Sequence, residues 1–280
     1  MLRLLNIEFI KLWNNKASKF LILAYFVLLG FISLFASIKF NFGFFKFHAA
    51  EMGIFNFPYI WHFNTYVAAE LKFFLAIVIV SMVANEYSNK TIKQNLIDGL
   101  SKKEFIISKF ATVTVFAILS TLYIFILSLI LGLVFSSYTE ASIIFSDLEY
   151  LLAFFVKLLG FFSFCLFVGI LIKRSAFALG FILLWYIMIE GIARFVLFIL
   201  ETTKDFQYAD AITQFFPLKA MSNLIDQPLS RLGAVKEIAS VAGEDLSYDY
   251  AVHWFEIVIV LVWTAIFMFF SYRLLLKRDL

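Results

Sequence analysis

The sequence predicts an all-α polytopic membrane protein, and three observations support this fold class. Hydrophobic residues occupy 63% of the 280 positions, well above their share in ordinary soluble domains. Six apolar stretches are each about as long as the ~20 residues that a helix needs to cross ~30 Å of hydrocarbon. Basic residues gather in alternate gaps between these stretches. The predicted spans are 20–38, 67–84, 110–135, 150–172, 175–199 and 252–276.

The distribution of basic residues predicts the orientation. Lysines and arginines are concentrated at both chain ends and in the second and fourth gaps, whereas the other gaps hold few or are outweighed by acids. Because cytoplasmic loops are rich in Lys and Arg, we expect a multi-pass protein of the inner (cytoplasmic) membrane with both termini in the cytoplasm. The basic residues on the cytoplasmic side are Arg3, Lys11, Lys16, Lys19, Lys90, Lys93, Lys102, Lys103, Lys109, Lys173, Arg174, Arg273, Lys277 and Arg278.

The composition limits the alternatives. Six spans and their connections nearly fill the chain, so we expect a single transmembrane domain over 1–280 with membrane lipid around it. The net charge is +3, and the basic residues lie scattered at helix ends, which disfavours nucleic-acid binding. The single cysteine, Cys165, lies in the fourth span and cannot form an intrachain disulfide.

Residues 1–16 precede the first span and read as an amphipathic helix. Leu5, Phe9 and Leu12 share one face, together with Leu2 and Trp13, whereas the polar residues lie mostly on the other. A basic amphipathic helix with an edge tryptophan lies in the headgroup plane. We therefore expect an N-terminal interfacial helix.

Two outer gaps differ in character. The gap 39–66 is aromatic and nearly uncharged, so we expect it in the outer interface; its His48 and His62 lack the neighbours of a metal site, and we expect no metal. The gap 200–250 is a long outer loop with apolar pieces too short to cross. Two readings stay open for it: re-entrant helices backed by protein, or a plain loop in water.

The cytoplasmic segment 85–109 predicts two helices with a break between them. Gly99 is a natural helix stop, and Ser101 with Glu104 forms a capping box for the next helix. A short helix over 86–98 therefore lies across the base of the spans with a small apolar face. Its exposed polar face suits docking onto a partner; a tight turn without a partner is the alternative.

This arrangement resembles the permease subunit of ATP-binding-cassette (ABC) transporters of the type-2 family. The resemblance covers most of the chain: an amphipathic entry helix, six spans, a Glu-centred segment leading through a Thr to a short helix and a Ser-Lys-Lys-Glu step, a long outer loop and a basic tail. Lys90 and Gly99 stand where the family commonly has Gly and Pro. The resemblance implies that 86–98 is the coupling helix, which docks on the ATPase through Glu86, Tyr87, Asn89, Lys90, Thr91, Lys93, Gln94 and Asp98.

The same resemblance implies the partners. Two ABC ATP-binding subunits would bind ATP and Mg, and a second permease copy would complete a homodimer. None of the eleven glycines opens a phosphate loop, and no nucleophile–base constellation is apparent. We therefore expect no bound cofactor and no enzyme activity in this chain by itself.

Ionisable residues inside spans are costly, so their positions are informative. With this topology all of them fall in the outer half of the bilayer. Lys157 and Glu190 are placed at similar depths by the helix rise, so we expect them to pair across two helices. The proposed outer polar belt, or gate, consists of Glu70, Lys157, Glu190, Arg194 and Glu256. The alternative is that these side chains reach the outer headgroups individually.

The function predicted is that of an ATP-driven permease, acting as an exporter. The uncharged inner halves of the spans favour a lipidic or amphipathic cargo over a small ion. An ion-coupled secondary transporter is the main alternative, although it usually has charges near the midplane and internal repeats. A membrane-embedded enzyme is a further alternative that lacks a credible nucleophile.

Overall fold

The computed structural model describes residues 2–36, 40–42, 45–47, 53–138, 140–204, 209–231 and 249–278, and it is almost entirely helical. The parts of the two outer gaps outside these ranges, His48 among them, lie beyond the described residues. The elements are α1 (Leu2–Asn14), α2 (Lys16–Ala36), β1 (Phe40–Phe42), β2 (Phe45–Phe47), α3 (Tyr59–Glu70), α4 (Lys72–Ser88), α5 (Thr91–Ile97), α6 (Lys102–Phe135), α7 (Ala141–Ile144), α8 (Glu149–Ile172), α9 (Ser175–Leu184), η1 (Trp185–Glu190), α10 (Gly191–Lys204), α11 (Ala209–Thr213), α12 (Pro217–Asn223), η2 (Pro228–Arg231) and α14 (Trp254–Leu276).

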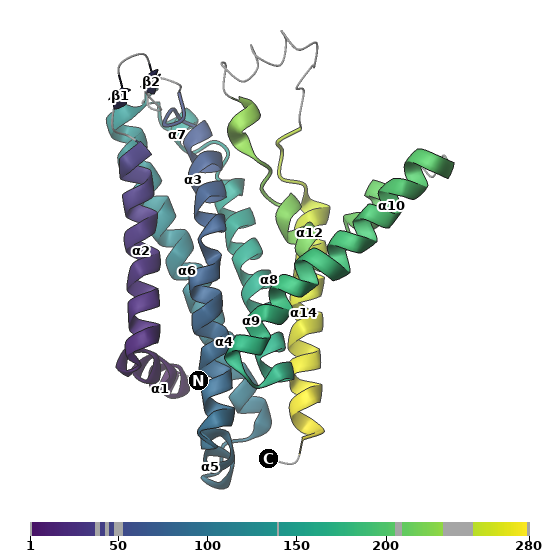
Figure 1. Cartoon of the computed structure of the whole chain (residues 1–280). Helices are drawn as coiled ribbons and strands as arrows, with labels where there is room; N and C mark the ends of the chain where they lie inside the picture. The colour runs from purple at the N-terminus through teal and green to yellow at the C-terminus, as the bar shows by residue number, and fades with distance from the viewer. Residues whose placement is uncertain are drawn as a thin grey trace.

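The long helices form a bundle around α8, which is buried along most of its length and packs against α3, α4, α6, α9 and α14. Both chain ends lie at one end of the bundle, which we call the base, and the β1–β2 hairpin lies at the opposite end, the top (Figure 1). Within the described residues five helices are long and apolar enough to cross a membrane, and the bent pair α3–α4 makes a sixth if it is counted as one span. The fold is therefore a polytopic helical membrane protein, with one short antiparallel hairpin that the sequence analysis did not anticipate.

The second span begins earlier than the predicted residue 67. Helix α3 starts at Tyr59 and joins α4 at a bend of 43°, so the expectation that 39–66 lies wholly in the outer interface is wrong for 59–66. The polar residues of α3 lower its hydropathy, although they are buried against protein. Trp61 Nε1 donates to the Ile144 carbonyl at 2.9 Å, and Asn64 Nδ2 donates to Ser128 Oγ at 2.8 Å.

The fifth span is interrupted. Between α9 and α10 the chain forms one π-helical segment, η1, which ends at Glu190. A π-helical turn changes the direction in which side chains point and is frequent at functional sites. Helix α10 leans away from the rest of the bundle (Figure 1), and most of the span is exposed in the single chain.

Helix α1 lies across the base beside α2 (Figure 1) and packs against α6. Leu12 is buried, whereas Leu2 and Trp13 are 83% and 52% exposed, so only part of the predicted apolar face contacts protein. The exposed Leu2 and Trp13 leave an apolar edge, as expected for a helix in the headgroup plane. The buried side also carries Glu8, an acid that the sequence analysis did not single out.

Candidate functional site

The short helix α5 projects from the base between the ends of α4 and α6 (Figure 1). Ile92 anchors its buried side at 2% exposure. Gly99 follows it with φ +98°, a conformation that L side chains rarely adopt, and so confirms the predicted helix stop. The capping box is also present: Ser101 Oγ accepts from the Glu104 amide at 3.1 Å, and the Glu104 carboxylate accepts from the Ser101 amide at 2.9 Å.

Most residues of the predicted docking surface are accessible. The exposed members are Asn89, Lys90, Lys93, Gln94 and Asp98, and Thr91 is half-buried. Lys90 adopts φ +57° immediately before the helix. This left-handed position explains why glycine is common there in the family that the sequence resembles, since glycine takes such a conformation without steric cost.

Two members of the predicted set face inward. Glu86 is 5% exposed and its carboxylate points into the bundle, so its assignment as a docking residue is wrong. Tyr87 is half-buried and its hydroxyl accepts from Arg278 Nη1 at 3.2 Å. The reason is that both residues belong to the last turn of α4, which packs against the base of the bundle, and not to α5.

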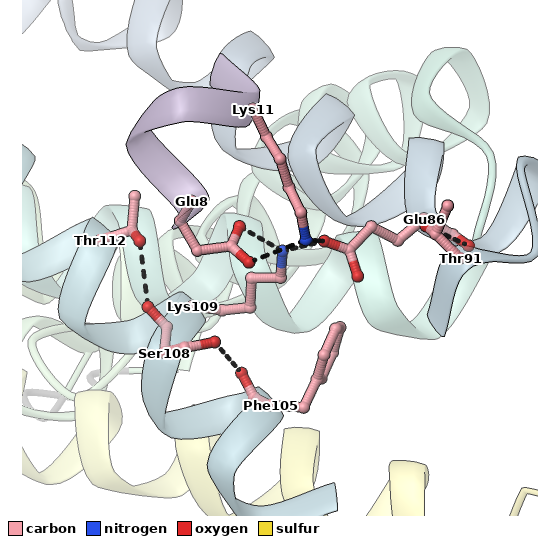
Figure 2. Close-up of polar contacts among 8 residues, drawn as sticks. All are labelled: Glu8, Lys11, Glu86, Thr91, Phe105, Ser108, Lys109 and Thr112. Carbon is pink, nitrogen blue, oxygen red and sulfur yellow. Dashed lines mark hydrogen bonds and ion pairs between the residues drawn. The ribbon is translucent and has the colours of Figure 1, made fainter. Parts of the chain in front are cut away.

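Glu86 belongs to a buried charge cluster that joins three helices (Figure 2). The Lys109 ammonium on α6 binds Glu86 of α4 and also Glu8 Oε2 of α1, the latter at 2.5 Å. Lys11 adds a second cation, 3.1 Å from Glu86 Oε1 and 3.3 Å from Glu8 Oε1. We call these four residues the base cluster.

The base cluster is balanced, with two carboxylates and two ammonium groups. Lys109 is fully buried and Glu8 and Glu86 are each 5% exposed, so each charge depends on its partners for the solvation it has lost. Burial lowers the pKa of Lys11, but the carboxylates of Glu86 and Glu8 outweigh burial, and the net pKa of Lys11 is raised. The Lys11 ammonium therefore keeps its charge near neutral pH.

The tail makes a second connection at the base. Arg278 donates to the Ile170 carbonyl and, at 2.9 Å, to the Leu171 carbonyl at the end of α8. A cation at the last carbonyls of a helix is favourable, because these groups have no intrahelical partner. Since Arg278 also contacts Tyr87, the end of α4 that leads into α5 is fixed to α8 as well as to α1 and α6.

A second polar site lies toward the top, where spans hold the short helix α12. Glu190 accepts from the amides of Leu218 and Lys219 in the first turn of α12 at 2.9 and 3.0 Å. At the other end, Lys157 Nζ donates to the carbonyls of Ser222 and Ile225 at 3.3 and 3.5 Å. An acid at the N-terminus and a cation at the C-terminus match the polarity of a helix.

Two further contacts fix the chain around α12. Trp263 Nε1 of α14 donates to the Phe215 carbonyl at 2.8 Å, and His62 Nε2 of α3 lies 2.7 Å from the Asp226 carbonyl. The backbone of 215–226 is thus held by four different spans. We call Lys157, Glu190, Trp263 and His62 the α12 seat. Lys157 gives the position of the seat along the bundle. It lies eight residues after the first residue of α8 and therefore ~12 Å below the start of that helix.

The expected ion pair between Lys157 and Glu190 is absent, because α12 lies between the two side chains and each binds one of its ends. Arg194 donates to the backbone carbonyl of Glu190 at 3.3 Å and lies over the Tyr186 ring. Glu70 is exposed at the end of α3, and Glu256 is half-buried in the first turn of α14. The five predicted belt residues therefore do not form one connected group among the described contacts.

Comparison with known proteins identifies the family. A sequence model described as "ABC-2 family transporter protein" matches residues 16–280. A comparison with curated proteins gives no significant match. Because the match covers nearly the whole chain, this protein belongs to the ABC-2 transporter family and is a transmembrane permease component.

Proposed function

We propose that this chain is one of two permease halves of an ATP-driven exporter, and that α5 couples it to separate ATP-binding subunits. Family membership supports the partnership with ABC ATPases. The observation that carries the assignment of α5 is how it is held. It exposes polar side chains, while the preceding helix α4 is fixed to α1 and α6 by buried charges and to α8 through Arg278. A helix mounted in this way transmits a displacement at its surface to several spans.

The α12 seat supports an outer gate in the same scheme. Four spans contribute one polar side chain each to the backbone of 215–226, so the segment holds its place only while those spans keep their present arrangement. A change in the spacing of α3, α8, η1 and α14 would break contacts to α12. We propose that this is how movement at the base opens the top.

Charge reversal on α5 tests the coupling. We expect Lys90→Glu with Lys93→Glu to release the ATPase, or to abolish the stimulation of ATP hydrolysis by the permease, at unchanged permease abundance. Both lysines are exposed, so their loss costs the fold little, whereas like charges across an interface cost several kcal/mol. Copurification of the ATPase with the tagged full-length permease measures the first effect, and ATPase rates of the reconstituted complex measure the second.

The matched control reverses two exposed lysines outside α5, Lys16→Glu with Lys103→Glu, for the same change in net charge. We expect this control to keep the ATPase bound. Full ATPase binding and normal coupling in the α5 variant would remove α5 from the docking surface.

Orientation is tested by cysteine labelling in intact cells. The base, with both termini, is proposed to face the cytoplasm and the top to face outward. We expect Ser101→Cys to resist an impermeant thiol reagent and Glu140→Cys to react, because both sites are exposed but lie at opposite ends of α6. The native Cys165 is fully buried and supplies the unreactive background. Labelling of Ser101→Cys alone would invert the scheme.

A further inference from the structure

A cavity of about 200 Å³ lies beside α12, where the second span is broken. Its walls come from the α3–α4 bend, α8, α9, η1 and α12. Three of its lining residues are acidic or basic: Glu70, Lys72 and Lys157. The remaining walls are mainly aromatic and aliphatic, so the cavity combines a charged end with apolar sides.

Neither lysine forms a close ion pair within the described part of the chain, and Glu70 and Asp226 act on them only at longer range. Lys157 is 3% exposed and its ammonium makes only the two long contacts with carbonyls of the α12 segment. The Lys72 ammonium lies over the rings of Phe73 and Phe161, at 5.3 and 5.4 Å from their centroids. Lys157, a buried cation without a close counter-ion, is costly at this depth, so the site favours an incoming negative charge.

The backbone adds to this preference. Helix α4 begins at Lys72, directly after the break at Leu71, and its N-terminal end lies at the cavity wall. The N-terminal end of a helix carries partial positive charge. Glu70 is the one acid at the wall, and it is exposed. The cavity therefore has an excess of positive charge.

The shape indicates what kind of anion fits. A volume of 200 Å³ equals six or seven water molecules at roughly 30 Å³ each, enough for a head group but not for a long chain. Phe73, Leu183 and Tyr186 on its walls are 42%, 54% and 52% exposed. The cavity thus opens sideways between α4 and η1, at the level of the spans, through apolar side chains.

We propose that this cavity binds the anionic head, phosphate or carboxylate, of an amphipathic molecule whose apolar chain passes out between α4 and η1. Lys72 and Lys157 contact the head from two helices, and Phe73 and Phe161 line the path of the first carbons. Binding requires this chain alone. That such an amphiphile is the transported substrate rests on the proposed export function.

Native mass spectrometry of the purified full-length chain, in uncharged micelles, tests the binding. The probes are dodecyl phosphate, dodecyl phosphocholine with the same chain and a zwitterionic head, and inorganic phosphate without a chain. We expect one saturable dodecyl phosphate, bound at least tenfold more tightly than either of the other two. Lys72→Met should raise its Kd about tenfold, the loss of one charge-assisted contact, and Lys157→Met should do the same.

Two variants complete the test. Glu70→Gln should tighten binding two- to threefold, because it removes the one acid at the wall. Lys219→Met is the matched control: it lies on α12 and loses the same charge, but it does not line the cavity, and its Kd should not change. Thermal midpoints show whether Lys157→Met remains folded. Because Lys72 is half-exposed, Lys72→Met should fold, and its Kd tests the proposal if Lys157→Met is unfolded.

An unchanged Kd in Lys72→Met, or equal binding of the phosphate and phosphocholine probes, would overturn the proposal. Equal binding of inorganic phosphate would replace it with a site for free anions. If the chain binds dodecyl phosphate as expected but its complex with the ATPase does not transport it, that result would contradict the export function and leave the binding site in place.

Discussion

Lys109→Met is expected to destabilise the protein by about 3–5 kcal/mol, the range for removing one partner of a buried ion pair. Among the described residues, the Lys109 ammonium alone joins Glu8 to Glu86 from inside the bundle, because Lys11 approaches from the partly exposed side. Without it two carboxylates lie close together with little access to water. Unfolding in mixed detergent micelles measures the change, with the thermal midpoint as a second readout.

The control is Lys103→Met, an exposed lysine two turns earlier on the same helix, for which we expect a change within ~0.5 kcal/mol. The informative rescue is the triple variant Glu8→Gln, Glu86→Gln, Lys109→Met, which removes the buried charges together. Replacing a whole buried ion network is often neutral or stabilising, so stability should return. A triple variant that is less stable than Lys109→Met would show that the carboxylates have other essential contacts.

The base cluster also shows the limit of the sequence analysis. Long apolar runs indicate helices and their number, because a span must satisfy its backbone internally. Capping residues and Gly99 mark the ends of α5 and α6 for equally local reasons. Glu8 carried a signal that was missed: it stands between Leu5 and Leu12 on the apolar face of an amphipathic helix. An acid at such a position needs a buried cation, but the sequence does not say that Lys109, 101 residues later, supplies it.

The sequence pattern did not predict helix α3 or the η1 segment, and the reasons differ. His62, Asn64 and Thr65 lower the hydropathy of α3, yet these residues face protein and not lipid, since all three are buried. The π-helical turn has no local signature in its apolar sequence. Because a π-helical turn alters the direction of side chains, a regular helix rise could not predict the contacts of Glu190.

The second large effect is expected at the α12 seat, from Glu190→Ala. Glu190 is 3% exposed and accepts from two backbone amides and from Trp185 Nε1 at 3.0 Å. Its removal leaves one buried donor, the Leu218 amide, and two partly buried donors without an acceptor. A buried unsatisfied donor costs about 1–3 kcal/mol, so we expect a loss of several kcal/mol and a weakened outer gate. Arg194→Ala is the matched control, because that side chain contacts Glu190 only through the backbone carbonyl; it should cost less than Glu190→Ala in the same measurement.

A double-mutant cycle between Glu190→Ala and Lys157→Met identifies how the two residues are connected. They hold opposite ends of α12 and do not touch, so the first substitution should release α12 and leave the second with little more to remove. We expect the double variant to be less stable than either single variant but more stable than the sum of the two losses predicts, both in unfolding free energy and in transport. Strict additivity would mean that α12 does not carry the coupling, and a double variant more stable than either single one would point to a direct ion pair.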